Sequence, residues 1–228
     1  MPIFQASDHV EVYRTRALMD DVHELSGRGK NYSLTDFVNR RILSFLDFEE
    51  KNHIVDIGCG DGSLLKIIND MYLTRCSGIL PTNEEVERLK KFFSKEDCKL
   101  SFYQGFVQEL PLDSECANVI ICNGVFILLS SEKEVRNALH EISRIAVQGA
   151  KIWIGEVPDK NEMEAKPYGN SIFLWLWYVL TKQGISVCWK RFIDVLRAYF
   201  GKEIIIIQPK TLFYISEESM LFLRNHVD

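Results

Sequence analysis

The sequence lacks a net positive charge, a long apolar run and any Cys-x-x-Cys pair, and each absence excludes a class of protein. It carries 27 Lys and Arg against 32 Asp and Glu, a net charge of −5, so we expect no nucleic-acid partner. No apolar run reaches the roughly 20 residues that cross a bilayer. The six cysteines are scattered, which predicts reduced core thiols and no metal site.

The amino-terminal residues show no basic region followed by an apolar run, and we therefore expect a cytoplasmic location. With 46% hydrophobic and 26% charged residues, the chain can bury one substantial core. It shows no repeat and no low-complexity linker. The simplest organisation is a single domain over residues 1–228, with a helical and aromatic insertion at about 158–200.

Short β-type runs alternate with helical patterns along the first two thirds of the chain, which predicts a parallel sheet flanked by helices. Ser33 or Thr35 could cap the first helix of this region, and Ser131 with Glu134 makes a capping-box pattern. We expect strands at 53–57, 75–80, 100–104, 118–122 and 151–157, and helices at 35–46, 63–71, 83–93 and about 131–145.

Beyond Pro158 the pattern changes to a polar segment, an aromatic run at 172–180 and a helix at 186–199. Two strand-like runs follow, at 204–207 and 220–224. These last two runs could form an antiparallel pair.

The most informative stretch is residues 54–62, where an apolar run meets Asp-x-Gly-x-Gly-x-Gly. Glycine permits positive φ and lets a ligand approach the backbone, and the next helix offers unpaired N–H groups. The spacing matches neither a dinucleotide fold nor a P-loop, so a dinucleotide oxidoreductase is a weak alternative. A Gly-rich turn without a ligand stays open, but alternating glycines destabilise a turn unless something requires them.

The four residues Asp56, Gly58, Gly60 and Gly62 resemble motif I of the class I S-adenosylmethionine-dependent methyltransferases. The resemblance covers roughly residues 35–157 well and the C-terminal third in outline only. It implies an α/β fold with a Rossmann-like seven-stranded mixed sheet flanked by helices, five parallel strands being followed by a C-terminal antiparallel hairpin. It also implies S-adenosylmethionine as the cofactor, bound at the carboxyl ends of the strands.

The first cofactor contacts implied by the resemblance come from the turn after the first strand. Asp56 would support the turn or meet the amino group of the cofactor, although a turn or capping role would suit this residue equally. The backbone of the turn would approach the cofactor at Gly58, Cys59 and Gly60.

The second strand departs from the family, whose members usually end it with an acid that takes both ribose hydroxyls. Leu80 stands at this position. Two charge-assisted hydrogen bonds are thereby lost, which weakens cofactor binding unless a neighbour substitutes. Among Thr82, Asn83 and Glu84, Asn83 is the preferred substitute, while Thr82 and Asn83 would also suit a helix cap.

A second acid of the family is missing after the third strand, where Gly105-Phe106-Val107 stands. Phe106 could stack on adenine and the Val107 N–H could meet a ring nitrogen, although phenylalanine in such a domain is more often core. Asn118 likewise replaces the usual acid before the fourth strand. Asn123, after that strand, is a candidate for the methionine end or the substrate, and also a turn former.

Many relatives fold an early helix over the cofactor and bring Tyr or Arg to its carboxylate. The resemblance therefore makes Tyr13 and Arg14 candidates. A charged, solvated helix face would produce the same pattern.

Methyl transfer requires mainly orientation of nucleophile and methyl group, since the cofactor brings the reactive group. An oxygen nucleophile would still benefit from a general base. Glu156, at the end of the fifth strand, is our candidate catalytic residue, with a local capping or pairing role as the alternative. His140 and His226 are less well placed, and Tyr168 could approach the substrate from the following loop.

Residues 171–180 are rich in Trp and Phe, which suits a substrate lid, a homodimer contact or a peripheral membrane contact as well as a packed helix. We predict S-adenosylmethionine-dependent methyl transfer to a small molecule, with a saccharide or a lipid-linked intermediate as candidate acceptors. The alternative is a non-catalytic binding or scaffold protein that retains the fold, motivated by Leu80, Phe106 and Asn118.

Overall fold

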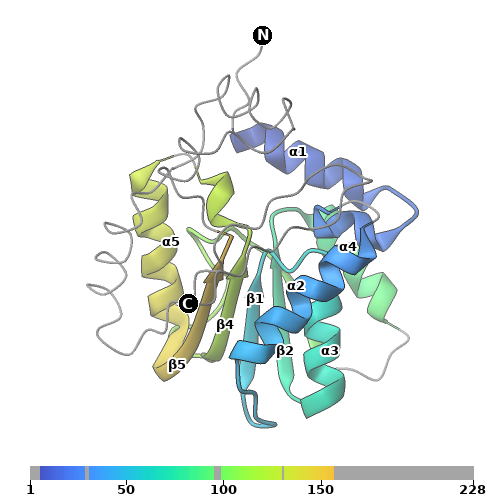
Figure 1. The fold of residues 1–228 in the computed structure, drawn as a ribbon. Coiled ribbons are helices and arrows are strands. Elements are labelled where there is room, and N and C mark those ends of the chain that lie inside the picture. Colours follow the sequence, from blue (N-terminus) through green and yellow to red (C-terminus); the bar gives the residue numbers. More distant parts are fainter. Residues whose placement is uncertain (1–5, 29–30, 95–98, 130, 157–228) are drawn as a thin grey trace, which may run out of the picture.

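A five-stranded sheet lies between two layers of helices (Figure 1). The computed structural model describes residues 6–28, 31–94, 99–129 and 131–156. Every neighbouring pair of strands in it is parallel, and the spatial order is β3-β2-β1-β4-β5. The strands are β1 (His53–Ile57), β2 (Arg75–Leu80), β3 (Leu100–Gln104), β4 (Ala117–Asn123) and β5 (Ala146–Gly155).

The order in which the strands are added to the sheet reverses between β1 and β4, and ligands bind at such a position in open α/β sheets. Helices α2 (Tyr32–Phe45), α3 (Ser63–Tyr72) and α4 (Asn83–Phe93) pack on one face, and α5 (Glu132–Ile145) packs on the other. Helix α1 (Ala6–Ala17) lies across the end toward which the strands point (Figure 1). The short 3₁₀ helices are η1 (Val22–Ser26) and η2 (Phe126–Leu128).

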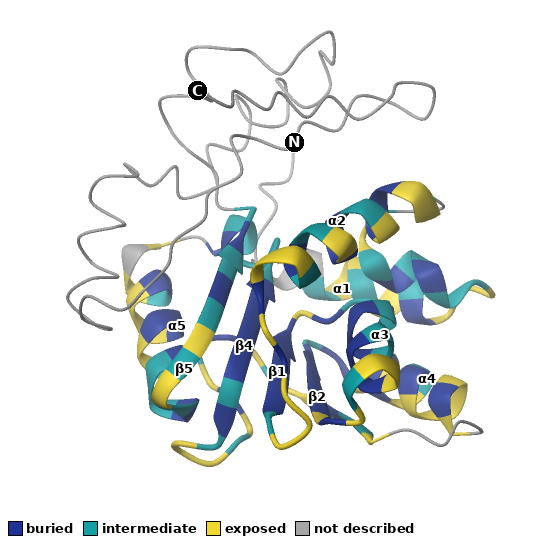
Figure 2. Cartoon of the chain, turned by 60° about the horizontal axis from the view of Figure 1, so that its bottom comes forward, coloured by how far each residue is buried: buried dark blue, intermediate teal, exposed yellow. Residues whose placement is uncertain are grey.

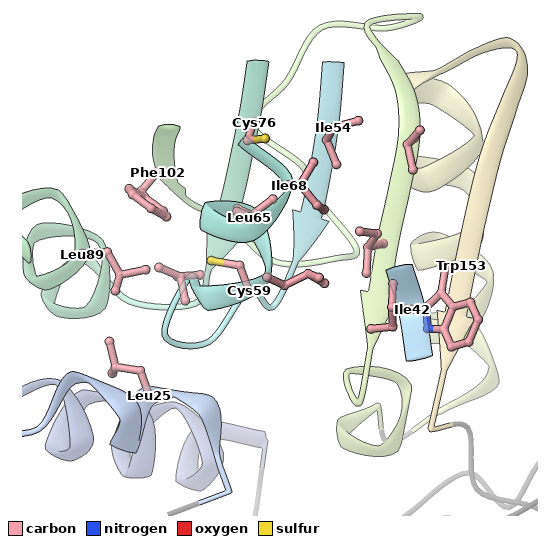
Figure 3. Close-up of a cluster of buried hydrophobic side chains, with 14 of the residues drawn as sticks. Leu25, Ile42, Ile54, Cys59, Leu65, Ile68, Cys76, Leu89, Phe102 and Trp153 are labelled. Carbon is pink, nitrogen blue, oxygen red and sulfur yellow. The ribbon is translucent and has the colours of Figure 1, made fainter. Parts of the chain in front are cut away.

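Two apolar cores form because successive strand residues point to opposite faces. Ile54 packs with the side chains of α2, α3 and α4, whereas its neighbour Val55 packs with those of α5. Because β1 has helices on both faces, all of it is buried, including the polar residues His53 and Asp56 (Figure 2). The first core extends from Leu25 in the amino-terminal segment to Trp153 on β5 (Figure 3).

The predicted strands and helices are found in this region, and β1, β2 and β3 have their expected bounds. β5 was predicted at 151–157 but runs from Ala146 to Gly155, because its pairing with β4 already begins where Ala146 meets Ala117. The cap of α2 was predicted wrongly: the helix begins earlier, and Asn31 is its cap, because the Asn31 side-chain oxygen accepts from the Leu34 N–H at 3.0 Å. Thr82 and Glu85 form a complete capping box at α4. The five parallel strands agree with the predicted sheet.

Several predictions fall outside the described residues and stay predictions. They concern the antiparallel hairpin of 204–207 and 220–224, the insertion at 158–200 and the aromatic segment 171–180. Within the described ranges the cysteines carry free thiols, and no helix there has the length and apolar character needed to cross a membrane.

His53 joins three strands at the base of the sheet. Its Nδ1 lies 2.9 Å from the Cys116 carbonyl oxygen and its Nε2 lies 2.8 Å from the Ser77 hydroxyl. Nδ1 therefore carries the proton, because a carbonyl only accepts, and Nε2 accepts from Ser77. The His53 backbone N–H donates to Oδ1 of Asn118 at 2.8 Å. The neutral amide of Asn118 thus supplies the oxygen acceptor for this N–H, and a carboxylate is not needed.

Replacing His53 with Ala should lower the free energy of unfolding by about 2 kcal/mol at pH 7.5, since Ser77 and the Cys116 carbonyl lose their partner. Burial lowers the pKa of His53, so the wild-type stabilisation is lost as pH falls below the unfolded value of about 6.5. Urea denaturation should show a smaller difference between the two proteins at pH 5. The exposed His140→Ala is the control; an equal loss there would contradict the assignment.

Candidate functional site

A cavity of about 310 Å³ opens at the carboxyl ends of the strands. Its walls come from the Gly turn after β1, the end of β2, the loops after β3 and β4, and the segment that contains α1 and η1. Its size lies at the lower end of the range for small-molecule sites. The cavity is therefore where the predicted cofactor turn and the amino-terminal segment meet.

The Gly turn is shaped by positive φ angles and by what packs against it. Gly58 and Gly60 have φ of +74° and +56°, values that L side chains rarely adopt. A Cβ on Gly60 would lie 3.0 Å from the Ser26 Cα and 3.2 Å from the Leu25 carbonyl oxygen. The missing side chain thus makes room for the backbone of η1 as well as for a ligand.

His23 and Asp61 fasten η1 to this turn. Both side chains are buried, and His23 Nδ1 lies 2.6 Å from Asp61 Oδ2. The other carboxylate oxygen of Asp61 accepts from the Ser63 N–H at 3.0 Å, and His23 Nε2 lies 3.3 Å from the Thr35 hydroxyl. The sequence does not reveal this pair, since His23 lies far from the motif and no pattern links it to Asp61.

Asp56 is the most unusual charged group in the cavity wall. It is 5% exposed, and no hydrogen bond joins its carboxylate to the residues that the structure describes. Burial raises the pKa of Asp56 to about 7, with Arg28 opposing the shift and Asp61 adding to it. Burying the charged form of this carboxylate costs free energy, and a cationic hydrogen-bond donor in the cavity would offset that cost.

Most of the predicted site residues line this cavity. Phe106 is 45% exposed, so its ring lies on the cavity wall rather than in the core. Cys59 lies in the wall, but its side chain belongs to the core (Figure 3). The predicted residues brought together are Asp56, Gly58, Cys59, Gly60, Leu80, Phe106, Val107, Asn123, Tyr13 and Glu156.

Asn83 and Arg14 do not line the cavity. Asn83 is an exposed residue in the first turn of α4. Arg14 pairs with Glu84 on that helix at 3.1 Å, and Arg88 of α4 donates to the Met19 carbonyl oxygen at 2.9 Å. These contacts hold the amino-terminal segment on α4, so Arg14 attaches this segment to the helix and does not line the cavity.

Polar side chains gather where β4 and β5 end. Asn123 Oδ1 accepts from Trp153 Nε1 at 3.1 Å, and the Asn123 amide nitrogen is buried without a partner among the described residues. Glu156 has φ of +54°, a strained conformation for a non-glycine residue. Its carboxylate lies 3.3 Å from the Arg28 guanidinium. Arg28 was also missed, because a lone surface-type arginine gives no sequence signal.

Comparison with known proteins identifies a domain within the chain. Residues 54–149 match the model of a methyltransferase domain, a range that holds the Gly turn and runs into β5. Residues 54–149 thus form a methyltransferase domain, consistent with the class I S-adenosylmethionine-dependent methyltransferases.

The curated and structural relatives agree with this placement. YrhH, a proposed methyltransferase of Bacillus subtilis (strain 168), is 22% identical over 59% of this chain and 74% of its own length. The [4+2]-cyclase SpnF is 16% identical with a TM-score of 0.63, over 87% of this chain and 73% of its own. Phosphoethanolamine N-methyltransferase 1 of Haemonchus contortus was solved with phosphoethanolamine and S-adenosylhomocysteine. It is 17% identical with a TM-score of 0.57, and the match covers 69% of this chain and 34% of that protein's chain. At these identities the solved structures show the fold.

The residues present fit S-adenosylmethionine, the cofactor of this family. The cofactor carries an ammonium and a sulfonium cation, which suit the unpartnered Asp56 carboxylate. The positive-φ glycines leave backbone rather than side chains at the wall, and Phe106 offers an exposed aromatic face for a base. The fit rests on these groups and not on the family match.

Asp56→Asn should stabilise the ligand-free protein, and increasingly so at higher pH. The folded-state pKa of about 7 exceeds the unfolded value of about 3.9, so the wild type loses stability as pH rises through this window. We expect the stability gain of the variant to grow by roughly 2 kcal/mol between pH 5 and pH 8. Urea unfolding of both proteins at pH 5 and pH 8 measures this gain, and Asp20→Asn, at an exposed position, is the control. A gain for Asp56→Asn that is the same at both pH values would contradict the assignment.

Proposed function

We propose that this protein transfers the methyl group of S-adenosylmethionine to a small-molecule acceptor, with a saccharide or a lipid-linked intermediate as candidates. The observation that carries the proposal is the unpartnered, buried carboxylate of Asp56 beside the Gly turn of a methyltransferase domain. When bound, the cofactor supplies an electrophilic methyl group on a sulfonium.

The residues of the chain would bind and orient the reactants. Asp56 would accept from the ammonium group of the cofactor, and α1 with η1 would exclude water from above the turn. The α1 contacts to α4 and the His23–Asp61 pair support this closure. Segment 171–180 stays a proposed acceptor lid, homodimer contact or peripheral membrane contact.

Glu156 is the proposed general base for an oxygen acceptor. It lines the cavity at the end of β5, and one of its oxygens faces Gly124, where a Cβ would lie 2.8 Å away. Arg28 holds the other oxygen, which fixes the orientation of the carboxylate. The positive φ of Glu156 supports the proposal, because strained backbone is common at functional sites.

Calorimetric titration with S-adenosylmethionine and S-adenosylhomocysteine tests the cofactor assignment. We expect micromolar dissociation constants, about −8 kcal/mol, and a loss of at least tenfold in Asp56→Asn. NADH serves as the control ligand and should not bind. Absence of binding by folded wild type would favour a scaffold protein; binding without methyl transfer to any screened acceptor would favour a binding protein that retains the site.

Glu156→Gln separates catalysis from binding. We expect affinity for S-adenosylhomocysteine within about threefold of wild type, because the cofactor is assigned to other residues, and methyl transfer slower by about 100-fold, the low end for loss of a general base. The rate should be measured by formation of S-adenosylhomocysteine in the presence of an acceptor found by screening. Unchanged turnover in Glu156→Gln would refute the catalytic role and leave Glu156 as a partner of Arg28.

A further inference from the structure

Glu85 is a second buried carboxylate in the cavity wall, and neither the sequence motif nor the proposed mechanism uses it. It lies in the first turn of α4 and is 1% exposed. Of the two residues that follow Thr82 and could have replaced the missing acid at Leu80, Asn83 is exposed, and Glu84 pairs with Arg14 outside the cavity. Glu85 lines the cavity.

One oxygen of Glu85 is engaged and the other is not. Oε2 accepts from the Thr82 N–H at 3.1 Å and from the Thr82 hydroxyl at 2.7 Å, which closes the capping box. No hydrogen bond to Oε1 comes from any residue that the structure describes. Burial raises the pKa of Glu85, against the hydrogen bonds from Thr82 that lower it. This second oxygen is therefore available to a hydrogen-bond donor in the cavity that the described residues do not supply.

The order of the strands indicates which part of a ligand would lie beside the free oxygen of Glu85. Asp56 ends β1 at the Gly turn, Glu85 follows β2, and Phe106 follows β3, and these strands are neighbours in that order. S-adenosylmethionine is a linear molecule with an ammonium at one end, a ribose in the middle and adenine at the other end. With the ammonium at Asp56, the ribose hydroxyls come next along the sheet edge, beside β2.

We infer that Glu85, rather than a residue at the end of β2, accepts the ribose hydroxyls of the cofactor through its free oxygen. This inference rests on the proposed cofactor site. It also explains why Leu80 can be apolar and buried, since the carboxylate reaches the cavity from the helix one turn further along the chain.

Glu85→Gln tests the inference, because glutamine keeps an oxygen for the capping box. Calorimetry should use S-adenosylhomocysteine and its 2′,3′-dideoxy counterpart. For the first ligand we expect affinity to fall at least tenfold in Glu85→Gln; for the second, the substitution should change affinity by less than twofold. The matched control is Glu87→Gln, an exposed acid of the same helix that lies outside the cavity, which should behave as wild type with both ligands.

Each other outcome has a distinct meaning. An equal loss for both ligands would show that Glu85 acts only through the cap of α4, and no loss would show that its free oxygen does not meet the ribose; either result overturns the inference while leaving the cofactor assignment intact. Failure of the wild type to bind S-adenosylhomocysteine would overturn the proposed function and this inference together.

Discussion

The packing of η1 against the Gly turn is the constraint on which the rest of the site depends. The turn after β1 leaves no space for a Cβ at Gly60 because the backbone of Leu25 and Ser26 occupies it. The buried His23–Asp61 pair then holds η1 in this position. Arg14 and Arg88 add contacts between the same amino-terminal segment and α4, so η1 and α1 are attached to two neighbouring parts of the cavity wall.

Two buried carboxylates, those of Asp56 and Glu85, lie in the cavity wall at a cost to the stability of the fold. Asp56 and Glu85 each present a carboxylate with unused hydrogen-bonding capacity to the same cavity, and burying such groups costs free energy. That cost becomes useful if a cationic, hydroxyl-bearing ligand supplies the missing donors, because binding then relieves it. Arg28 is the cation that the described part of the chain contributes to this wall, and it is held by Glu156.

The departures from the family pattern have local physical reasons. Asn118 accepts from the His53 N–H in a base-of-sheet network whose other partners are neutral, so an acid is not required there. Leu80 packs in the core, and a carboxylate approaches the cavity from α4 instead. Phe106 lies exposed on the wall. The fold is thus retained with different polar groups around the cavity.

The sequence by itself determined the order of strands and helices, because apolar periodicity, caps and glycine spacing are local properties that each segment carries. It also located the Gly turn, Asp56 and Glu156 on one edge of the sheet, since the carboxyl ends of parallel strands meet there. Only the tertiary structure decided the pairing of His23 with Asp61, the outward position of Asn83 and the inward position of Glu85. Asn83 and Glu85 are two residues apart on one helix, so about 200° of rotation separates them, and the packing of α4 against the sheet and α1 selects which of them faces the cavity.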